Sequence, residues 1–240
     1  FNGIPFFTDI PNQSIYTHNV SATDVNAANN SAYGFLALSS VTTGDNNVAM
    51  GYLAGRLINT GERNVTIGSH AGDALTTGNY NIAVGHGALS AEDANGSTTA
   101  VGYKALNVQN AGTESYNVAV GFEAGKTLTT GVQNTVVGGL VGRAITTGQQ
   151  NAIYGYAAGL ALTTGNFNTA IGTQALSVED EHGRNTAVGY QALKVQNAGA
   201  DALNTAVGYQ AGLAMTTGVN NTIIGALAGD ALTSGSYNVA

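Results

Sequence analysis

The chain of 240 residues contains no cysteine, no tryptophan and only two prolines, Pro5 and Pro11. Without cysteine there is neither a disulfide nor a thiolate metal ligand. The sequence therefore does not indicate whether the protein resides in an oxidising or a reducing compartment. Charged residues make up 9% of the sequence, compared with about 25% in a typical soluble domain. Seven Lys and Arg residues, spread along a chain of net charge −7, cannot form a phosphate-binding stripe. We therefore expect no nucleic-acid partner.

Long apolar runs are missing as well. No run reaches the eighteen or so residues that a membrane span needs, so we expect no membrane insertion. Glycine is abundant, with 34 copies, and Ala, Val, Ile and Leu supply most of the apolar content. This composition predicts small buried side chains. The chain begins at Phe1 without Met and stops at Ala240 inside a recurring motif, so we expect a segment of a longer protein.

A repeat of about 17 residues organises the chain. The string NTAVGYQA occurs at 185–192 and again at 204–211, and its glycine recurs with spacings of 17, apart from two of 19. We number each repeat from this glycine, called position 0. A second period of 87 residues relates each repeat to the one five repeats later, which indicates a duplicated five-repeat block. Position 0 is occupied by Gly34, Gly51, Gly68, Gly85, Gly102, Gly121, Gly138, Gly155, Gly172, Gly189, Gly208 and Gly225.

Other positions of the repeat are nearly as regular. Position −4 is Asn in eleven of twelve repeats, with Thr98 as the exception. Position +3 is Ala in eleven, position +7 is Val, Ile, Leu or Met in eight, and position +10 is Gly in ten, usually within Thr-Thr-Gly. Two repeats sum to 34 residues, a period typical of helix-pair solenoids. Glycine and β-branched residues in every repeat, with little Glu, Lys or Arg, argue against helices.

We therefore predict an all-β fold, a parallel β-solenoid with one repeat per coil. Each coil is expected to hold two strands of about five residues and two glycine-containing turns. Stacked coils place Asn above Asn, which predicts a ladder of side-chain amides. The glycines that recur in every repeat are expected to have positive φ or to allow close approach of another backbone. The predicted repeat domain covers 30–240, with twelve coils centred on Gly34 to Gly225 and continuing past 240. Residues 1–29 match no repeat and are predicted to be an N-terminal cap or a junction segment.

Aromatic residues at position +1 suggest an assembly of several chains. They form an interrupted column that suits an intersubunit contact, and a scatter of surface tyrosines is the alternative. A single slender roll buries little apolar area per coil, so it gains from association with other copies. The column consists of Phe35, Tyr52, Tyr103, Phe122, Tyr156, Tyr190 and Tyr209.

The repeat NTAVGYQAL…TTG…NTAIG resembles the left-handed β-roll of YadA-type trimeric adhesin heads. It is more similar still to the 17-residue variant found in bacteriophage tail fibres and related bacterial surface proteins. The resemblance covers about 30–240, although the adhesin repeat is shorter, at about fourteen residues. It implies a left-handed β-roll, a homotrimer, and a place in a virion tail fibre or on the bacterial cell surface. It supplies no catalytic residues.

Candidate sites were weighed against simpler explanations. Glu92-Asp93 and Glu179-Asp180-Glu181 are interpreted as solvated turn tips rather than as a catalytic carboxylate pair or a Ca²⁺ site. Calcium-binding β-rolls carry the motif Gly-Gly-x-Gly-x-Asp in every coil, and this motif does not recur in the sequence. Four histidines occupy unrelated repeat positions and are not expected to form a metal-ligand set; they are His18, His70, His86 and His182. We accordingly predict no catalytic, cofactor-binding or metal-binding residue and no cofactor.

Two further features have competing interpretations. Threonine pairs at positions +8 and +9 resemble an ice-binding array, but the repeats at Gly85, Gly102, Gly172 and Gly189 lack them, which breaks the lattice. Only one Thr of each pair is expected to face outward. The two longer repeats contain 106–116 and 193–203, and these are expected to be excursions that are either receptor-binding loops or neutral insertions.

The resulting expectation is a non-catalytic structural and attachment fibre, without enzyme activity. Its expected partners are further copies of itself in a homotrimer and a polysaccharide or protein receptor on a host surface. Two alternatives stay open. One is a polysaccharide-degrading enzyme of the tailspike type, with an active groove between chains. The other is an ice-binding or matrix β-solenoid.

Overall fold

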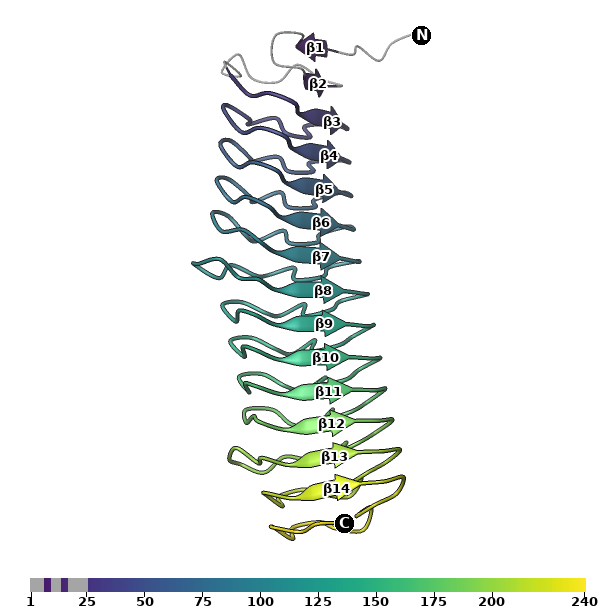
Figure 1. The fold of residues 1–240 in the computed structure, drawn as a ribbon. Coiled ribbons are helices and arrows are strands. Elements are labelled where there is room, and N and C mark those ends of the chain that lie inside the picture. Colours follow the sequence, from purple (N-terminus) through teal and green to yellow (C-terminus); the bar gives the residue numbers. More distant parts are fainter. Residues whose placement is uncertain (1–6, 10–13, 17–25) are drawn as a thin grey trace. The chain divides into compact units, whose positions relative to one another are not determined.

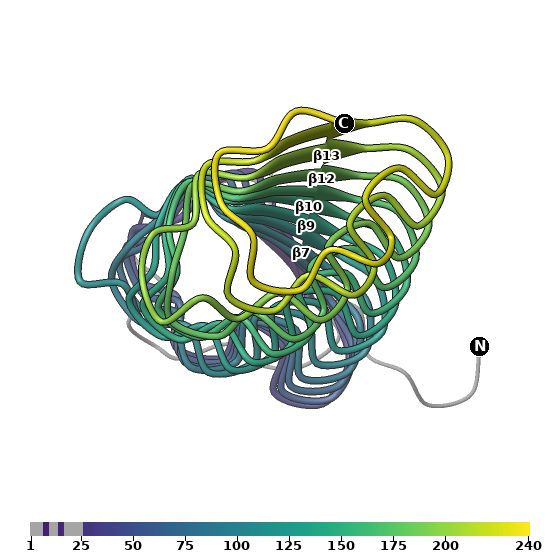
Figure 2. The ribbon, with the colours of Figure 1, turned by 90° about the horizontal axis from the view of Figure 1, so that it is seen from below.

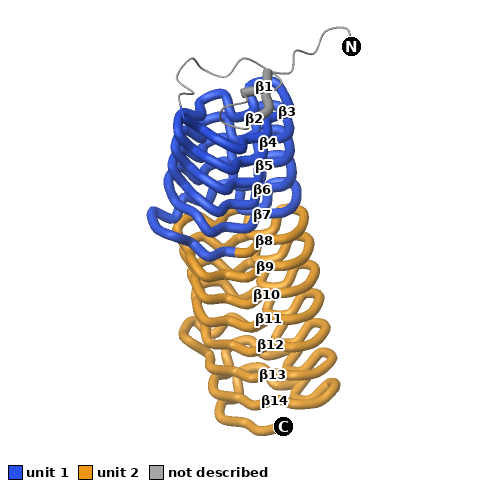
Figure 3. Tube along the Cα trace, turned by 45° about the horizontal axis from the view of Figure 1, so that its top comes forward, with its two compact units in different colours: residues 1–117 blue, residues 118–240 orange. Residues whose placement is uncertain are grey.

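The computed structural model describes residues 7–9, 14–16 and 26–240 (Figure 1). The chain divides into two compact units, residues 1–117 and 118–240 (Figure 3). Both units are all-β, and the predicted parallel β-solenoid is confirmed in each. Among the described residues there is no helix long and apolar enough to cross a membrane.

Each coil contributes one strand of three residues, which ends immediately before the position-0 glycine. Unit 1 contains β1 (Phe7–Asp9), β2 (Ser14–Tyr16), β3 (Ser31–Tyr33), β4 (Val48–Met50), β5 (Val65–Ile67), β6 (Ile82–Val84) and β7 (Thr99–Val101). Unit 2 contains β8 (Val118–Val120), β9 (Thr135–Val137), β10 (Ala152–Tyr154), β11 (Thr169–Ile171), β12 (Thr186–Val188), β13 (Thr205–Val207) and β14 (Thr222–Ile224). The expectation of two five-residue strands per coil was wrong.

The strands of each unit pair in the register of the sequence repeat. In unit 1, β2 to β7 are parallel neighbours, and Ser31 lies opposite Val48, seventeen residues later. In unit 2, β8 to β14 are parallel neighbours, and Thr186 lies opposite Thr205 across one of the longer repeats. Within each unit the strand arrows run left to right across the near side while the chain descends (Figure 1), and the view from below shows the return segments on the opposite side (Figure 2). This winding is left-handed.

The interior of each coil is narrow because its columns are filled mainly by small residues. The middle residue of every repeat strand, position −2, is buried, and the residues on either side of it face outward. This alternation follows from the two-residue period of a strand. Positions +3 and +7 also face the interior, as with Ala54 and Ile58 in unit 1 and Ala158 and Leu162 in unit 2, all fully buried. Position +4 adds a fully buried leucine in five coils: Leu38, Leu89, Leu106, Leu176 and Leu193.

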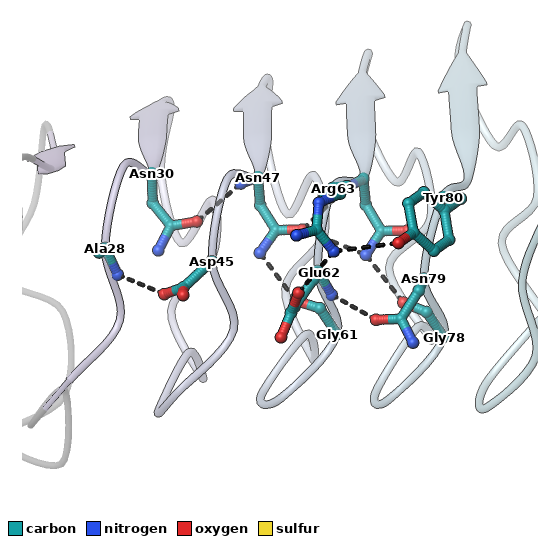
Figure 4. Close-up of polar contacts among 11 residues, drawn as sticks. Ala28, Asn30, Asp45, Asn47, Gly61, Glu62, Arg63, Gly78, Asn79 and Tyr80 are labelled. Atoms are coloured by element: carbon teal, nitrogen blue, oxygen red, sulfur yellow. Dashed lines mark hydrogen bonds and ion pairs between the residues drawn. The ribbon is translucent and has the colours of Figure 1, made fainter.

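Asparagine at position −4 ties each coil together and holds it to the next. The side-chain Nδ2 of Asn47 donates to the carbonyl of Gly61 at the end of the same coil, at 2.8 Å. The Oδ1 of Asn30 accepts the backbone N–H of Asn47, also at 2.8 Å (Figure 4). Unit 2 repeats both bonds, with Asn168 N donating to Asn151 Oδ1 at 2.9 Å. The predicted amide ladder exists, but the bond that recurs along it joins the side-chain Oδ1 of one Asn to the backbone N–H of the Asn in the next coil.

Direct bonds between neighbouring asparagine side chains occur at only some steps. Examples are Asn64 to Asn47 in unit 1 at 3.1 Å, and Asn151 to Asn134 and Asn221 to Asn204 in unit 2, both at 3.0 Å. One buried amide departs from the pattern, since Nδ2 of Asn185 has no hydrogen-bond partner. The key test of vertical stacking is nevertheless met, because Asn185 N donates to Asn168 Oδ1 at 3.1 Å.

The position-0 glycine is required by close backbone contact as well as by its conformation. The predicted positive φ is confirmed, with values such as 125° at Gly155. A Cβ added to Gly155 would lie 2.7 Å from the carbonyl carbon and 2.8 Å from the carbonyl oxygen of Gly172 in the next coil. Any L side chain here therefore forces neighbouring coils apart.

The turns replace the expected second strand. Positions −5, +2 and +4 have left-handed φ values of 48–64°, and many of these residues are not glycine. Each position donates its N–H to an adjacent coil: Arg63 to Asp45, Leu53 to Phe35, and Leu38 to Ala54. Hydrogen bonds between coils thus stabilise a conformation that normally costs about 1–2 kcal/mol per non-glycine residue.

The N-terminal segment is described only in part. Strand β1 pairs with β2 antiparallel, and β2 pairs with β3 in parallel. The interpretation of 1–29 as a cap or junction remains a prediction, and 1–6, 10–13 and 17–25, which include His18, lie outside the described residues.

We predict that Gly155→Ala lowers the free energy of unfolding by at least about 3 kcal/mol, because it combines an unfavourable φ with backbone overlap. Gly112→Ala is the matched control. Gly112 also has positive φ, 69°, but nothing lies within 4 Å of its added Cβ, so the expected cost is about 1 kcal/mol. Thermal melting followed by circular dichroism measures both. Equal destabilisation by the two substitutions would contradict the contact argument.

Candidate functional site: an aromatic column and two buried acidic clusters

Unit 1 carries a continuous stack of rings on its surface, here called the aromatic column. Its centroid separations are 6.0 Å for Phe35–Tyr52, 5.4 Å for Tyr52–His70, 6.2 Å for His70–His86 and 5.6 Å for His86–Tyr103. These distances lie within the range of favourable ring pairs. The prediction of an aligned column rather than scattered tyrosines is confirmed here.

Histidines complete this column, which the sequence reasoning missed. The third coil has Ser69 at position +1, and His70 at position +2 fills the gap, held by an Nδ1–Asp73 Oδ2 contact of 2.9 Å. His86 occupies position +1 of the next coil. The signal in the sequence was the alignment of His86 with Tyr52 and Tyr103 in the repeat register.

In unit 2 the aligned column is shorter. Tyr190 and Tyr209 stack at 5.3 Å with an interplanar angle of 12°. Gly139 and Thr173 interrupt position +1 of this unit. Beside the tyrosine pair, Gln191 donates to Gln174 at 2.7 Å and Gln210 donates to Gln191 at 2.9 Å. Both side-chain ladders show that identical repeat positions lie directly over one another.

Outward-facing strand residues add apolar surface next to the column. We call positions −3 and −1 of the repeat strands the strand face. Tyr33 is 52% exposed, Met50 is 50% exposed and Ile224 is 61% exposed. Large exposed apolar surfaces on soluble proteins commonly mark interaction sites. Further exposed members are Val48, Ile82, Tyr154, Ile171 and Val207.

The interpretation of the acidic clusters as solvated tips was wrong for their first residues. Glu92 and Glu179 are fully buried, with 0% exposure, whereas Asp93 and Glu181 are exposed. Both buried carboxyls occupy position +7, which is an interior column elsewhere filled by Val, Ile, Leu or Met. Gln109 and Gln196 occupy the same column one coil later and are also fully buried. The sequence did contain the signal, because these four residues are the four exceptions to an apolar position +7.

The first cluster, in unit 1, satisfies its carboxyl with amides. Oε1 of Glu92 accepts bonds from the N–H and Nδ2 of Asn95 at 3.3 and 3.2 Å, and Oε2 accepts one from Nε2 of Gln109 at 3.4 Å. Gln109 in turn accepts a bond from Asn117 at 3.1 Å. Burial raises the pKa of Glu92, and the bonds from Asn95 and Gln109 oppose that rise.

The second cluster, in unit 2, has the same backbone register but different partners. His182 stands where Asn95 stands in the first block. Gln196, the counterpart of Gln109, donates instead to the carbonyl of Gly218 at 3.4 Å. Neither carboxyl oxygen of Glu179 has a hydrogen-bond partner, and neither does Nδ1 of His182, which lies 3.8 Å from Oε1 of Glu179.

The pKa of Glu179 reflects this environment. Burial raises it to about 7, and the negative charges of Asp180 and Asp201 add to the rise. The backbone amides of His182 and Asp180 point toward the carboxyl and lower the pKa in part, although neither meets hydrogen-bond geometry. The group therefore changes charge close to neutral pH.

The two longer repeats form exposed loop tips, as expected. Gly112, Thr113 and Glu114 are exposed in unit 1, and Gly199, Ala200 and Asp201 are exposed in unit 2. Figure 3 shows the first loop projecting from the side of unit 1. Whether either loop binds a receptor remains a prediction.

The first Thr of each threonine pair has a structural role, because its hydroxyl donates a hydrogen bond to the next coil. Oγ1 of Thr129 donates to the carbonyl of Thr146 in the next coil at 3.1 Å, and Oγ1 of Thr42 donates to the carbonyl of Asn59 at the same distance. The second member of each pair, such as Thr43 or Thr130, is exposed. The second Thr of each pair therefore faces outward, as predicted, but Thr216 is exposed together with Thr217, so the prediction of one outward Thr per pair fails at that coil.

A shallow pocket in unit 2 is lined by Thr127, Arg143, Ala144 and Leu160. The neighbouring carboxyl of Glu123 lies 2.7 Å from both Lys126 Nζ and Arg143 Nε. The hydrogen bond from Lys126, with the positive charge of Arg143, lowers the pKa of Glu123. An ionised, ion-paired carboxylate is poorly suited to act as a general acid.

We predict that the free energy of unfolding decreases as pH rises from about 4.5 to 8. Glu179 holds its proton more tightly in the folded protein (pKa about 7) than in the unfolded chain (4.5). Its stabilising contribution is complete below pH 4.5 and is lost as pH rises through 7. The expected loss is on the order of 3 kcal/mol.

Urea unfolding across this pH range, in buffer with EDTA, tests the prediction. Glu179→Gln should flatten the slope, while Glu181→Gln, at an exposed neighbour, should leave it unchanged. A wild-type stability that rises over this range would contradict the assignment.

Comparisons with protein-family models, curated proteins and solved structures gave no match for this chain.

Proposed function

We propose that the chain is a non-catalytic segment of an attachment fibre, assembled as a homotrimer, in a bacteriophage tail fibre or a bacterial surface adhesin. The observation that carries this proposal is the aromatic column beside the strand face. Both recur with the coil period, so a second chain of the same sequence presents matching groups at the same spacing. Matching periods favour contact between copies of one chain.

The interior of the coil supports association with other chains. Its columns consist largely of Ala with one to three larger apolar residues per coil, so each coil buries little apolar area, and burial contributes about 25 cal/mol per Å². Tyrosine and phenylalanine bury roughly 150–250 Å² each when covered. Covering the aromatic column in a trimer supplies apolar burial that the single chain lacks.

The proposed location of the protein, a virion tail fibre or the bacterial cell surface, rests on the resemblance of its repeat to tail-fibre and adhesin β-rolls. Receptor contact is assigned to the exposed loop tips at 112–114 and 199–201, since loops that project from a solenoid form binding faces in other repeat proteins. The chemistry of the receptor is assigned only as a polysaccharide or protein of a host surface.

The enzyme and ice-binding alternatives have less support. The pocket in unit 2 is lined by no carboxyl group, and Glu123 beside it is ion-paired. The outward threonines are absent from two coils in every five. Polysaccharide cleavage by the purified chain would favour the tailspike alternative, and thermal hysteresis would favour ice binding.

We predict that the purified chain sediments as a trimer and that the double substitution Tyr190→Ser, Tyr209→Ser weakens association at least tenfold. Both rings are exposed in the single chain and would be covered in the trimer. The matched control is Tyr116→Ser, Tyr237→Ser, which removes two exposed tyrosines at position −5, outside the column. Analytical ultracentrifugation decides between the outcomes. A monomeric wild type, or equal weakening by both pairs, would remove the support for the trimer.

The attachment function itself is tested by immunogold electron microscopy with antibodies raised against the chain. We expect label along fibres that project from a virion or a cell surface. Label confined to the cell interior would contradict the proposal.

A further inference from the structure

The second acidic cluster combines three metal-binding side chains on one turn of unit 2. Glu179, Asp180 and His182 each offer one ligand atom, and these atoms all lie within 4.8 Å of one another. The strands and turns on either side are fixed by hydrogen bonds to adjacent coils, including Thr163 N to the carbonyl of Asp180 at 2.6 Å. The three side chains thus belong to a rigid part of the coil.

A buried carboxyl without partners is the independent sign that a ligand is missing. Glu179 is fully buried, and both of its oxygens and Nδ1 of His182 lack hydrogen bonds. A buried polar group left without a partner costs roughly 1–3 kcal/mol, and more when it is charged. Such groups are normally paired or bound to a metal.

The side-chain amide of Asn185, close to Glu179, is another buried group without a hydrogen-bond partner. Asn185 is 1% exposed, and its Nδ2 has no partner. In the next block of coils, the residues at the same two repeat positions, Met215 and Asn221, lie in contact, with Nδ2 3.6 Å from Sδ. The same register places Asn185 next to Glu179.

The first block of the duplication shows how this position is satisfied without a metal. There the carboxyl of Glu92 receives bonds from Asn95 and Gln109. In the second block, Asn95 is replaced by His182, and Gln196 bonds elsewhere. The change from Asn95 to His182 replaces a side-chain amide that donates to the carboxyl with an imidazole nitrogen that can act as a ligand.

We propose that Glu179, Asp180 and His182 form a binding site for a divalent transition-metal ion of the zinc type. One imidazole nitrogen and two carboxylates suit Zn²⁺, whereas Ca²⁺ and Mg²⁺ prefer ligand sets made of oxygen alone. Three protein ligands leave a coordination position for water. Bound metal would neutralise the carboxylates of Glu179 and Asp180, while Asp201 is already paired with Arg184 at 3.1 Å.

The test uses the full chain, stripped of metal with EDTA and titrated with ZnCl₂ by isothermal calorimetry. We expect one Zn²⁺ per chain and a higher melting temperature in its presence. His182→Asn should weaken binding at least tenfold, and it should fold because it copies the arrangement around Asn95. His86→Asn is the control, since it removes an imidazole from the aromatic column and should leave binding unchanged.

Visible absorption of the Co²⁺-loaded chain provides a second readout of the ligands. We expect d–d bands of a low-coordinate ion in the wild type and their loss in His182→Asn. Three results would each overturn the proposal: no Zn²⁺ binding by the wild type, equal Zn²⁺ binding by His182→Asn, or equal affinity for Ca²⁺. Binding at this site does not depend on trimer formation, so its failure leaves the proposed assembly standing.

Discussion

The asparagine amide at position −4 is the interaction on which the stacked coils depend. Its Nδ2 closes its own coil by bonding the glycine carbonyl fourteen residues later, and its Oδ1 receives the N–H of the next coil. One buried side chain thereby fixes both the size of a coil and the register between coils. The close glycine contacts, the left-handed turns and the column of rings all require that register, because each depends on contacts between neighbouring coils.

The duplicated blocks show that this backbone tolerates different chemistry in its interior. Glu92 and Glu179 share a repeat position, yet amides surround one, while the other faces an imidazole and has no hydrogen-bond donor. The backbone bonds between coils continue around both clusters, as with Thr76 to Asp93 and Thr163 to Asp180. Stability that comes from the backbone and the asparagines leaves the interior column free to carry polar groups.

Periodicity made most of the fold predictable. Equivalent residues seventeen apart had to stack once helices were excluded, and Asn168 with Asn185 meets that expectation. Strand content was overestimated because left-handed residues such as Leu53 and Gln191 follow no local propensity and are stabilised by bonds between coils. The acidic clusters were misjudged because adjacent carboxylates were read as surface residues, although the repeat position of Glu92 and Glu179 already pointed inward. The partners of those carboxyls depend on side-chain orientation, which spacing alone does not determine.

Contacts between coils join residues seventeen apart at most steps and nineteen apart at two, and this has a consequence for how the chain folds. Every coil closes a loop of nearly the same modest length, so the entropic cost of adding a coil is nearly constant, and growth can spread from any pair already formed. At the coils of Gly85 and Gly102 in unit 1 and of Gly172 and Gly189 in unit 2, position +7 switches to glutamate or glutamine, and a fully buried leucine at position +4 takes over the apolar role: Leu89, Leu106, Leu176 and Leu193. Each of these coils therefore still buries one leucine when it joins the array, so the polar switch at position +7 does not by itself make growth pause there.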